Sequence, residues 1–151
     1  MFQILVVCTA NICRSPAAQA ILNRALRGRS VQIDSAGTSA GPGNPVDASM
    51  GNLMIARGYP EVSAHRSRVL LPHHVVHYQL ILCMERHHLE QVCKINPIAT
   101  GKTMLLGHWN GESEVADPVG QSNETYMNSI DEIHEFCQKW VEKIITAGLV
   151  A

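Results

Sequence analysis

The stretch FQILVVCTANICRSPAAQAIL, residues 2–22, joins an apolar run to a helical pattern through a short polar loop. Residues 2–7 are almost all apolar, which is typical of a strand that is buried on both faces of a sheet. After Pro16 the apolar residues recur at helical spacing, and Gly28 follows the last of them. Proline in the first turn and glycine beyond the end favour a helix between them. We therefore expect a strand, a loop and a helix, with Cys8 at the carboxyl end of the strand.

The same alternation of strand and helix continues along the chain. Further strands are expected at residues 31–33, 78–83 and 103–106, and further helices at residues 47–57, 85–94 and 126–144. Strands separated by helices imply right-handed crossovers, so the pattern predicts an α/β fold with a parallel sheet and helices on both faces. Ligands bind beyond the carboxyl ends of the strands in such sheets, which is where Cys8 lies. The length predicts a single domain, residues 1–151.

Composition and charge exclude several classes of protein. Hydrophobic residues make up 46% of the chain and charged residues 17%, as in globular rather than disordered proteins. Twelve Lys and Arg against thirteen Asp and Glu argue against a nucleic-acid-coating role. No apolar run approaches the length of a membrane span, and no basic amphipathic helix suggests direct membrane binding. An odd number of cysteines, five, without a signal-peptide pattern, leads us to expect a cytoplasmic protein.

The loop CTANICR, residues 8–14, has the spacing of a phosphate-binding site with a nucleophile. Five residues between Cys8 and Arg14 allow successive backbone N–H groups to turn inward as an anion nest, and the helix that follows adds its positive end. The Arg14 guanidinium can grip two phosphate oxygens. The same donors would stabilise a Cys8 thiolate and its attack on phosphorus. The expected phosphate-binding residues are Thr9, Ala10, Asn11, Ile12, Cys13, Arg14 and Ser15.

Three further motifs follow this loop in order: DSAGT at residues 34–38, HRSR at 65–68 and DP at 117–118. Together the four motifs resemble those of low-molecular-weight protein tyrosine phosphatases over essentially the whole chain. The segments LCME (82–85) and GHWN (107–110) are most similar to the bacterial branch associated with exopolysaccharide and capsule gene clusters. The resemblance implies a three-layer α/β sandwich with a four-stranded parallel sheet in the order 2-1-3-4. It also implies phosphotyrosine hydrolysis through a phosphocysteine, with no metal or other cofactor.

The resemblance assigns catalytic roles to three residues. Cys8 is the nucleophile, Arg14 binds the phosphate, and Asp117 protonates the leaving group and then acts as a base toward water. It also makes Cys13 a redox partner that protects Cys8 through a reversible disulfide. The implied partner is a phosphotyrosine protein, namely a membrane-anchored bacterial tyrosine autokinase.

Four residues are expected to support the loop. Asn11, Ser35 and His65 resemble the network that holds the family's loop in shape, although the residues alone leave His65 open as an ordinary half-buried histidine. Asn11 is expected in the left-handed conformation, which asparagine tolerates. Ser15 either stabilises the Cys8 thiolate through its hydroxyl or caps the helix, and the two roles are compatible.

The chain departs from the family's pattern where aromatic residues usually flank the substrate. Val119 stands after Asp117-Pro118, and residues 39–46 read SAGPGNPV without a tryptophan. With Ile12 and Val119 as its apolar walls, the cleft is expected to be shallow and to hold isolated phosphotyrosine weakly.

Two other functions use some of the same residues. An arsenate reductase of this fold would need two further cysteines to relay a disulfide outward, for which Cys83 and Cys93 are the candidates. A non-catalytic phosphotyrosine-binding module would need neither nucleophile nor acid. The pairs His73-His74 and His87-His88 lack cysteines at zinc-binding spacing, so we expect no metal there and interpret these histidines as solvated.

Overall fold

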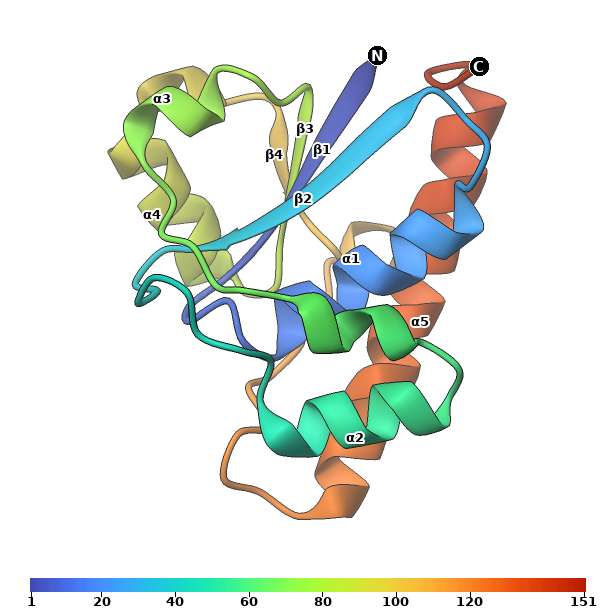
Figure 1. Ribbon diagram of the computed structural model, residues 1–151. Coiled ribbons are helices and arrows are strands. Elements are labelled where there is room, and N and C mark those ends of the chain that lie inside the picture. The colour runs from blue at the N-terminus through green and yellow to red at the C-terminus, as the bar shows by residue number, and fades with distance from the viewer.

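A four-stranded, all-parallel sheet forms the centre of the protein, whose computed structural model describes residues 1–151 (Figure 1). The strand order is β2-β1-β3-β4. The strands are β1 (Phe2–Cys8), β2 (Val31–Gly37), β3 (Leu80–Cys83) and β4 (Thr103–Leu105). The parallel register pairs Cys8 with Gly37, and Val7 with Cys83, so β1, β2 and β3 end at the same edge. The predicted fold class and strand order are confirmed.

Helices cover both faces of the sheet. In Figure 1, α1, α2 and α5 lie on one side of the strands, and α3 and α4 lie on the other. The α-helices are α1 (Arg14–Ala25), α2 (Ala48–Ala56), α3 (Pro72–Val75), α4 (Arg86–Ile95) and α5 (Asn123–Thr146). Short 3-10 helices occur at η1 (Pro60–Ala64), η2 (Pro97–Ala99) and η3 (His108–Asn110), and neither these nor α3 were predicted.

Strand β1 separates two hydrophobic cores. Ile4 and Val6 belong to the larger core, with α1 and α5, whereas Leu5 and Val7 belong to the smaller core, with α3 and α4. The division follows from strand geometry, because successive side chains point to opposite faces. Both faces of β1 are thereby buried, as its apolar run predicts, and the loop that follows Cys8 starts from a rigid strand.

Strand β2 extends further than the sequence indicates. The predicted strand ended at Ile33, but pairing with β1 continues to Gly37. The polar residues of this extension have partners, since Asp34 accepts a hydrogen bond from Tyr78 and Ser35 accepts one from Asn11. Gly37 passes so close to the loop that an added Cβ would lie 2.4 Å from the Thr9 carbonyl oxygen. Only glycine allows β2 to approach the loop in this way.

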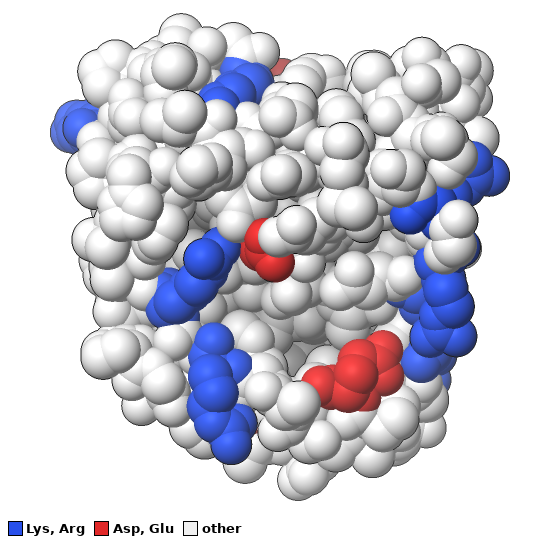
Figure 2. Space-filling view, turned by 45° about the horizontal axis from the view of Figure 1, so that its top comes forward, with Lys and Arg blue, Asp and Glu red and all other residues white.

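The protein surface carries charge of both signs in separate places. On the face shown in Figure 2, acidic and basic side chains form small patches around a hollow, with uncharged surface between them. This distribution agrees with the formal net charge of −1 and gives no continuous basic surface on that face. No helix of the structure is long and apolar enough to cross a membrane.

Candidate active site

The loop between β1 and α1 presents a row of unpaired backbone donors. None of the five N–H groups from Thr9 to Cys13 donates a hydrogen bond within the protein. The carbonyl groups behave in the opposite way, because those of Cys8 and Thr9 accept from Thr38 and Ser39, each at 3.0 Å. Further along, the Ile12 carbonyl accepts from the Asp47 N–H at 2.6 Å. The loop thus turns its acceptors outward and leaves its donors for an anion.

Asn11 is the centre of the hydrogen bonds that hold this loop. Its buried amide donates to the hydroxyls of Ser15 at 2.8 Å and Ser35 at 3.0 Å, and its Oδ1 accepts from the Arg68 N–H at 3.0 Å. Its φ is +57°, so the predicted left-handed conformation is confirmed. His65 Nε2 lies 2.6 Å from the Asn11 carbonyl oxygen and must donate to it. The expected network of Asn11, Ser15, Ser35 and His65 is therefore present, with Arg68 as a member that the prediction omitted.

The protonation state of His65 fits this role. Burial lowers the pKa of His65, although the hydrogen bond to the Asn11 carbonyl acts in the opposite direction. A neutral imidazole with its proton on Nε2 can donate to that carbonyl without placing a charge behind the loop.

Cys8 lies beside the hydroxyl of Ser15. The two side chains are buried, and Sγ and Oγ are 3.0 Å apart. The first turn of α1 has no side-chain cap, so Ser15 contacts the cysteine and does not cap the helix. A hydroxyl at this distance can donate to a thiolate and stabilise its charge.

The Arg14 guanidinium forms hydrogen bonds within the protein through only one of its nitrogens, Nη1. Nη1 donates to Glu85 Oε1 at 2.6 Å and to the Val115 carbonyl at 2.7 Å, and the side chain is 3% exposed. The Nε and Nη2 groups have no partner within the protein, so they are able to donate to two oxygens of a phosphate. Burial raises the pKa of Glu85, but Arg14 and His87 outweigh it and bring the pKa below its usual range. Glu85 is thus a carboxylate that orients Arg14.

Asp117 reaches the same pocket from a distant part of the chain. A cavity of about 90 Å³ is lined by Cys8, Ala10, Ile12, Cys13, Arg14, Asp117 and Val119. The exposed Asp117 carboxylate accepts from the Val119 N–H at 3.1 Å, a local bond that shapes the turn after Asp117. The structure thus brings together the nucleophile, arginine and acid expected from the sequence. No aromatic residue lines this cavity, as the departures at Val119 and residues 39–46 predict.

The interpretation of the paired histidines as solvated is wrong for His88. This side chain is fully buried, and its Nε2 lies 2.8 Å from Thr9 Oγ1 in the phosphate loop. Its Nδ1 accepts from the Glu85 N–H at 3.1 Å. Burial lowers the pKa of His88 to about 4, so the ring is neutral near pH 7. The spacing of His88 and Val92, four residues apart on a helix, was the signal that this residue faces inward.

The other cysteines are poorly suited to a disulfide relay. Cys83 is completely buried at the end of β3, and burial raises the pKa of its thiol well above the usual range. Cys93 lies within α4, which is a regular helix from Arg86 to Ile95. A relay needs an accessible thiolate on a mobile segment, and this arrangement therefore disfavours the arsenate reductase alternative.

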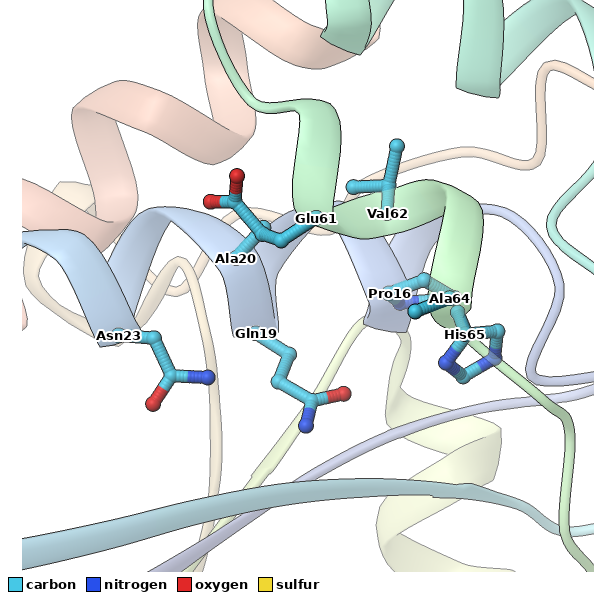
Figure 3. A pocket seen from close by; sticks show the side chains of 8 residues that line it. All are labelled: Pro16, Gln19, Ala20, Asn23, Glu61, Val62, Ala64 and His65. Atoms are coloured by element: carbon cyan, nitrogen blue, oxygen red, sulfur yellow. The ribbon is translucent and has the colours of Figure 1, made fainter.

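A second hollow lies behind the loop. It has a volume of about 240 Å³ between α1 and η1, and Figure 3 shows Gln19 and His65 among the side chains around it. Both residues support the phosphate loop. His65 donates to the Asn11 carbonyl, and Gln19 accepts from the hydroxyl of Ser35, the partner of Asn11, at 2.6 Å. Neither Cys8 nor Arg14 lines this hollow, so it is separate from the phosphate cavity.

Comparison with known proteins assigns the chain to a family. Residues 3–148 match the family described as low molecular weight phosphotyrosine protein phosphatase. The chain belongs to this family. This phosphatase is 38% identical over 141 residues to the probable low molecular weight protein-tyrosine-phosphatase AmsI of Erwinia amylovora, with 93% of this chain and 96% of AmsI covered. The family resemblance seen in the sequence is confirmed, and the protein is a protein-tyrosine-phosphatase.

Solved structures agree with this assignment. The phosphatase superposes on Wzb of Vibrio vulnificus in complex with benzylphosphonate with a TM-score of 0.89 at 36% identity, covering 94% of this chain and 98% of Wzb. It also superposes on YwlE arginine phosphatase from Geobacillus stearothermophilus with a TM-score of 0.90 at 32% identity, covering 99% and 96%. The same fold thus occurs in phosphatases named for different phosphorylated residues.

Proposed function

We propose that this phosphatase hydrolyses phosphotyrosine through a phosphocysteine intermediate on Cys8. The observation that carries the proposal is the row of five unpaired N–H groups from Thr9 to Cys13, in a loop that lines one cavity together with Cys8. Together with the free edge of Arg14, these donors match the three non-bridging oxygens of a phosphate monoester. The donors are held in place before substrate binds, so they stabilise the transition-state charge without reorganising.

In the first step the Cys8 thiolate attacks phosphorus opposite the tyrosine oxygen. The S–P bond forms as the P–O bond to the tyrosine breaks, and Asp117 gives its proton to the leaving oxygen. Arg14 and the loop N–H groups hold the equatorial oxygens, and Ser15 donates to the thiolate before attack.

In the second step water hydrolyses the phosphocysteine. The Asp117 carboxylate takes a proton from the attacking water, the P–S bond breaks, and inorganic phosphate leaves the loop. Cys8 returns to the thiolate and Asp117 to the acid, so the cycle needs no metal or other cofactor.

The cavity offers few contacts to the tyrosine ring, so the substrate is recognised mainly through the protein surface around its phosphotyrosine. Ile12 and Val119 are the apolar walls available to the tyrosine ring, and Val119 is 41% exposed. Without aromatic stacking the ring contributes little affinity, so the surface of the phosphorylated partner determines KM.

The partner we propose is a membrane-anchored bacterial tyrosine autokinase that regulates exopolysaccharide production. The support is the resemblance of residues 82–85 and 107–110 to the exopolysaccharide-associated branch of the family. We place the reaction in the cytoplasm, with residues 1–151 acting as one phosphatase domain. Five free cysteines fit a reducing compartment. Cys13, which lines the cavity beside Cys8, is proposed as the partner of a protective disulfide.

The test is hydrolysis of phosphotyrosine peptides near pH 6 with reductant and chelator present. Cys8→Ser should abolish turnover, and Asp117→Ala should slow it while a phosphocysteine becomes detectable by mass spectrometry. Cys93→Ser is the matched control, because it removes a thiol from α4 outside the cavity. Turnover by Cys8→Ser, or faster hydrolysis of phosphoarginine peptides than of phosphotyrosine peptides, would overturn the proposal.

A further inference from the structure

We propose that His88 is a positioning residue that ties the phosphate loop to the carboxylate partner of Arg14. The inference rests on the proposed function, since it concerns the geometry of the same reaction. Its basis is a pair of hydrogen bonds in which one buried imidazole takes part through its two nitrogens. One reaches Thr9, the residue after the nucleophile, and the other reaches the backbone of Glu85.

The partners of the ring determine its tautomer. The Glu85 N–H can only donate, so Nδ1 must present a lone pair and the proton of the neutral ring must be on Nε2. Nε2 then donates to Thr9 Oγ1 at 2.8 Å. Both ring nitrogens are satisfied in a fully buried site, where an unpaired one would be costly. The ring is therefore a fixed bridge between two segments.

The first segment is the start of the phosphate loop. Asn11, in the middle of the loop, is held by Ser35, His65 and Arg68. Thr9 is held by His88, which belongs to α4 on the opposite face of the sheet. The loop is thus anchored from both sides, and the anchor at Thr9 is adjacent to the reacting sulfur.

The second segment carries Glu85 at the N-terminal end of α4. The Glu85 carboxylate contacts Arg14 Nη1 and His87 Nε2, each at 2.6 Å. Because His88 holds the Glu85 main chain, it determines where this carboxylate stands and hence how the Arg14 guanidinium is oriented. The His88 imidazole therefore fixes the position of Arg14 relative to Cys8, although it forms a hydrogen bond with neither residue.

Thr9→Val tests this role, because valine keeps the shape of threonine and leaves the Nε2–H without an acceptor. We expect kcat to fall about 10- to 100-fold and inhibition by inorganic phosphate to weaken, since small displacements of aligned groups have effects of this size. Thr9→Ser keeps a hydroxyl, and its kcat should exceed that of Thr9→Val by about 10-fold. Thr103→Val is the matched control, because it removes a hydroxyl bond of 2.9 Å to Ala99 outside the site, and its kcat should equal the wild-type value.

A double-mutant cycle between Thr9→Val and His88→Asn supplies the second readout. If the two residues act through one bond, the second substitution should reduce kcat by less than twofold once the first is present. Equal kcat and phosphate inhibition in Thr9→Val, Thr9→Ser and Thr103→Val would overturn the inference. Such a result, with Cys8→Ser inactive, would leave the proposed function intact, whereas an active Cys8→Ser enzyme would overturn that function itself.

Discussion

Replacing Asn11 with alanine should lower both the stability and the catalytic activity of the protein. The substitution removes the amide that joins Ser15, Ser35 and the main chain of Arg68, and it places alanine at a φ of +57°. The loop would then lose the contacts that keep its N–H groups turned inward. We expect both the free energy of unfolding and kcat/KM to fall.

The structure gives the size of the effect. Each of the three hydrogen bonds contributes about 1 kcal/mol to stability. The left-handed conformation costs alanine about 1 kcal/mol more than asparagine, which tolerates it. The free energy of unfolding should therefore fall by about 4 kcal/mol, which for a domain of this size lowers Tm by roughly 8–16 °C. Typical domains are stable by about 5–15 kcal/mol, so the variant should still fold at 25 °C.

Urea unfolding and hydrolysis of an aryl phosphate measure the two effects. Asn11→Gly separates their causes, because glycine adopts positive φ freely and should recover about 1 kcal/mol relative to alanine. Asn52→Ala, on the exposed side of α2, is the control and should change stability by less than about 0.5 kcal/mol. A loss below about 1 kcal/mol in Asn11→Ala, with kcat/KM within about threefold of wild type, would refute the reasoning.

Three further predictions concern the cavity, the redox partner and the buried histidine. Val119→Tyr should lower KM for aryl phosphates by adding a ring to the cavity wall, and an unchanged KM would count against the shallow-cavity interpretation. Treatment with peroxide should give a Cys8–Cys13 disulfide, detected by peptide mass spectrometry, and reductant should restore activity. Irreversible loss of activity without the disulfide-linked peptide would show that Cys13 does not protect Cys8. His88, with its pKa lowered to about 4, stays neutral in the folded protein while the unfolded chain takes up a proton below about pH 6.5. The free energy of unfolding should therefore fall by about 3 kcal/mol from pH 6.5 to pH 4 on account of this residue, and His88→Gln should flatten that part of the urea-derived profile.

Local patterns in the sequence were sufficient for the fold and for the centre of the site. The apolar run of β1 predicts a buried strand because both of its faces pack against cores, and the Cys8 to Arg14 spacing predicts the nest because the loop is continuous in the chain. The ends of strands were predicted less well where polar residues form hydrogen bonds with residues distant in the chain. Strand β2 continues past Ile33 because Tyr78 and Asn11 satisfy the side chains of Asp34 and Ser35.

The roles of Ser15, Glu85 and His88 depended on the tertiary structure. The sequence left Ser15 open between capping and contact with the thiol, and the 3.0 Å separation from Cys8 decides for contact. Glu85 lies 71 residues from Arg14 along the chain, and His88 lies 79 residues from Thr9. No local pattern predicts such pairs, because they exist only where parallel pairing of β1 and β3 brings the start of α4 beside the phosphate loop. The sequence by itself predicted an anion nest between Cys8 and Arg14, whereas the packing of α4 against the loop decided that Glu85 and His88 hold its side chains in place.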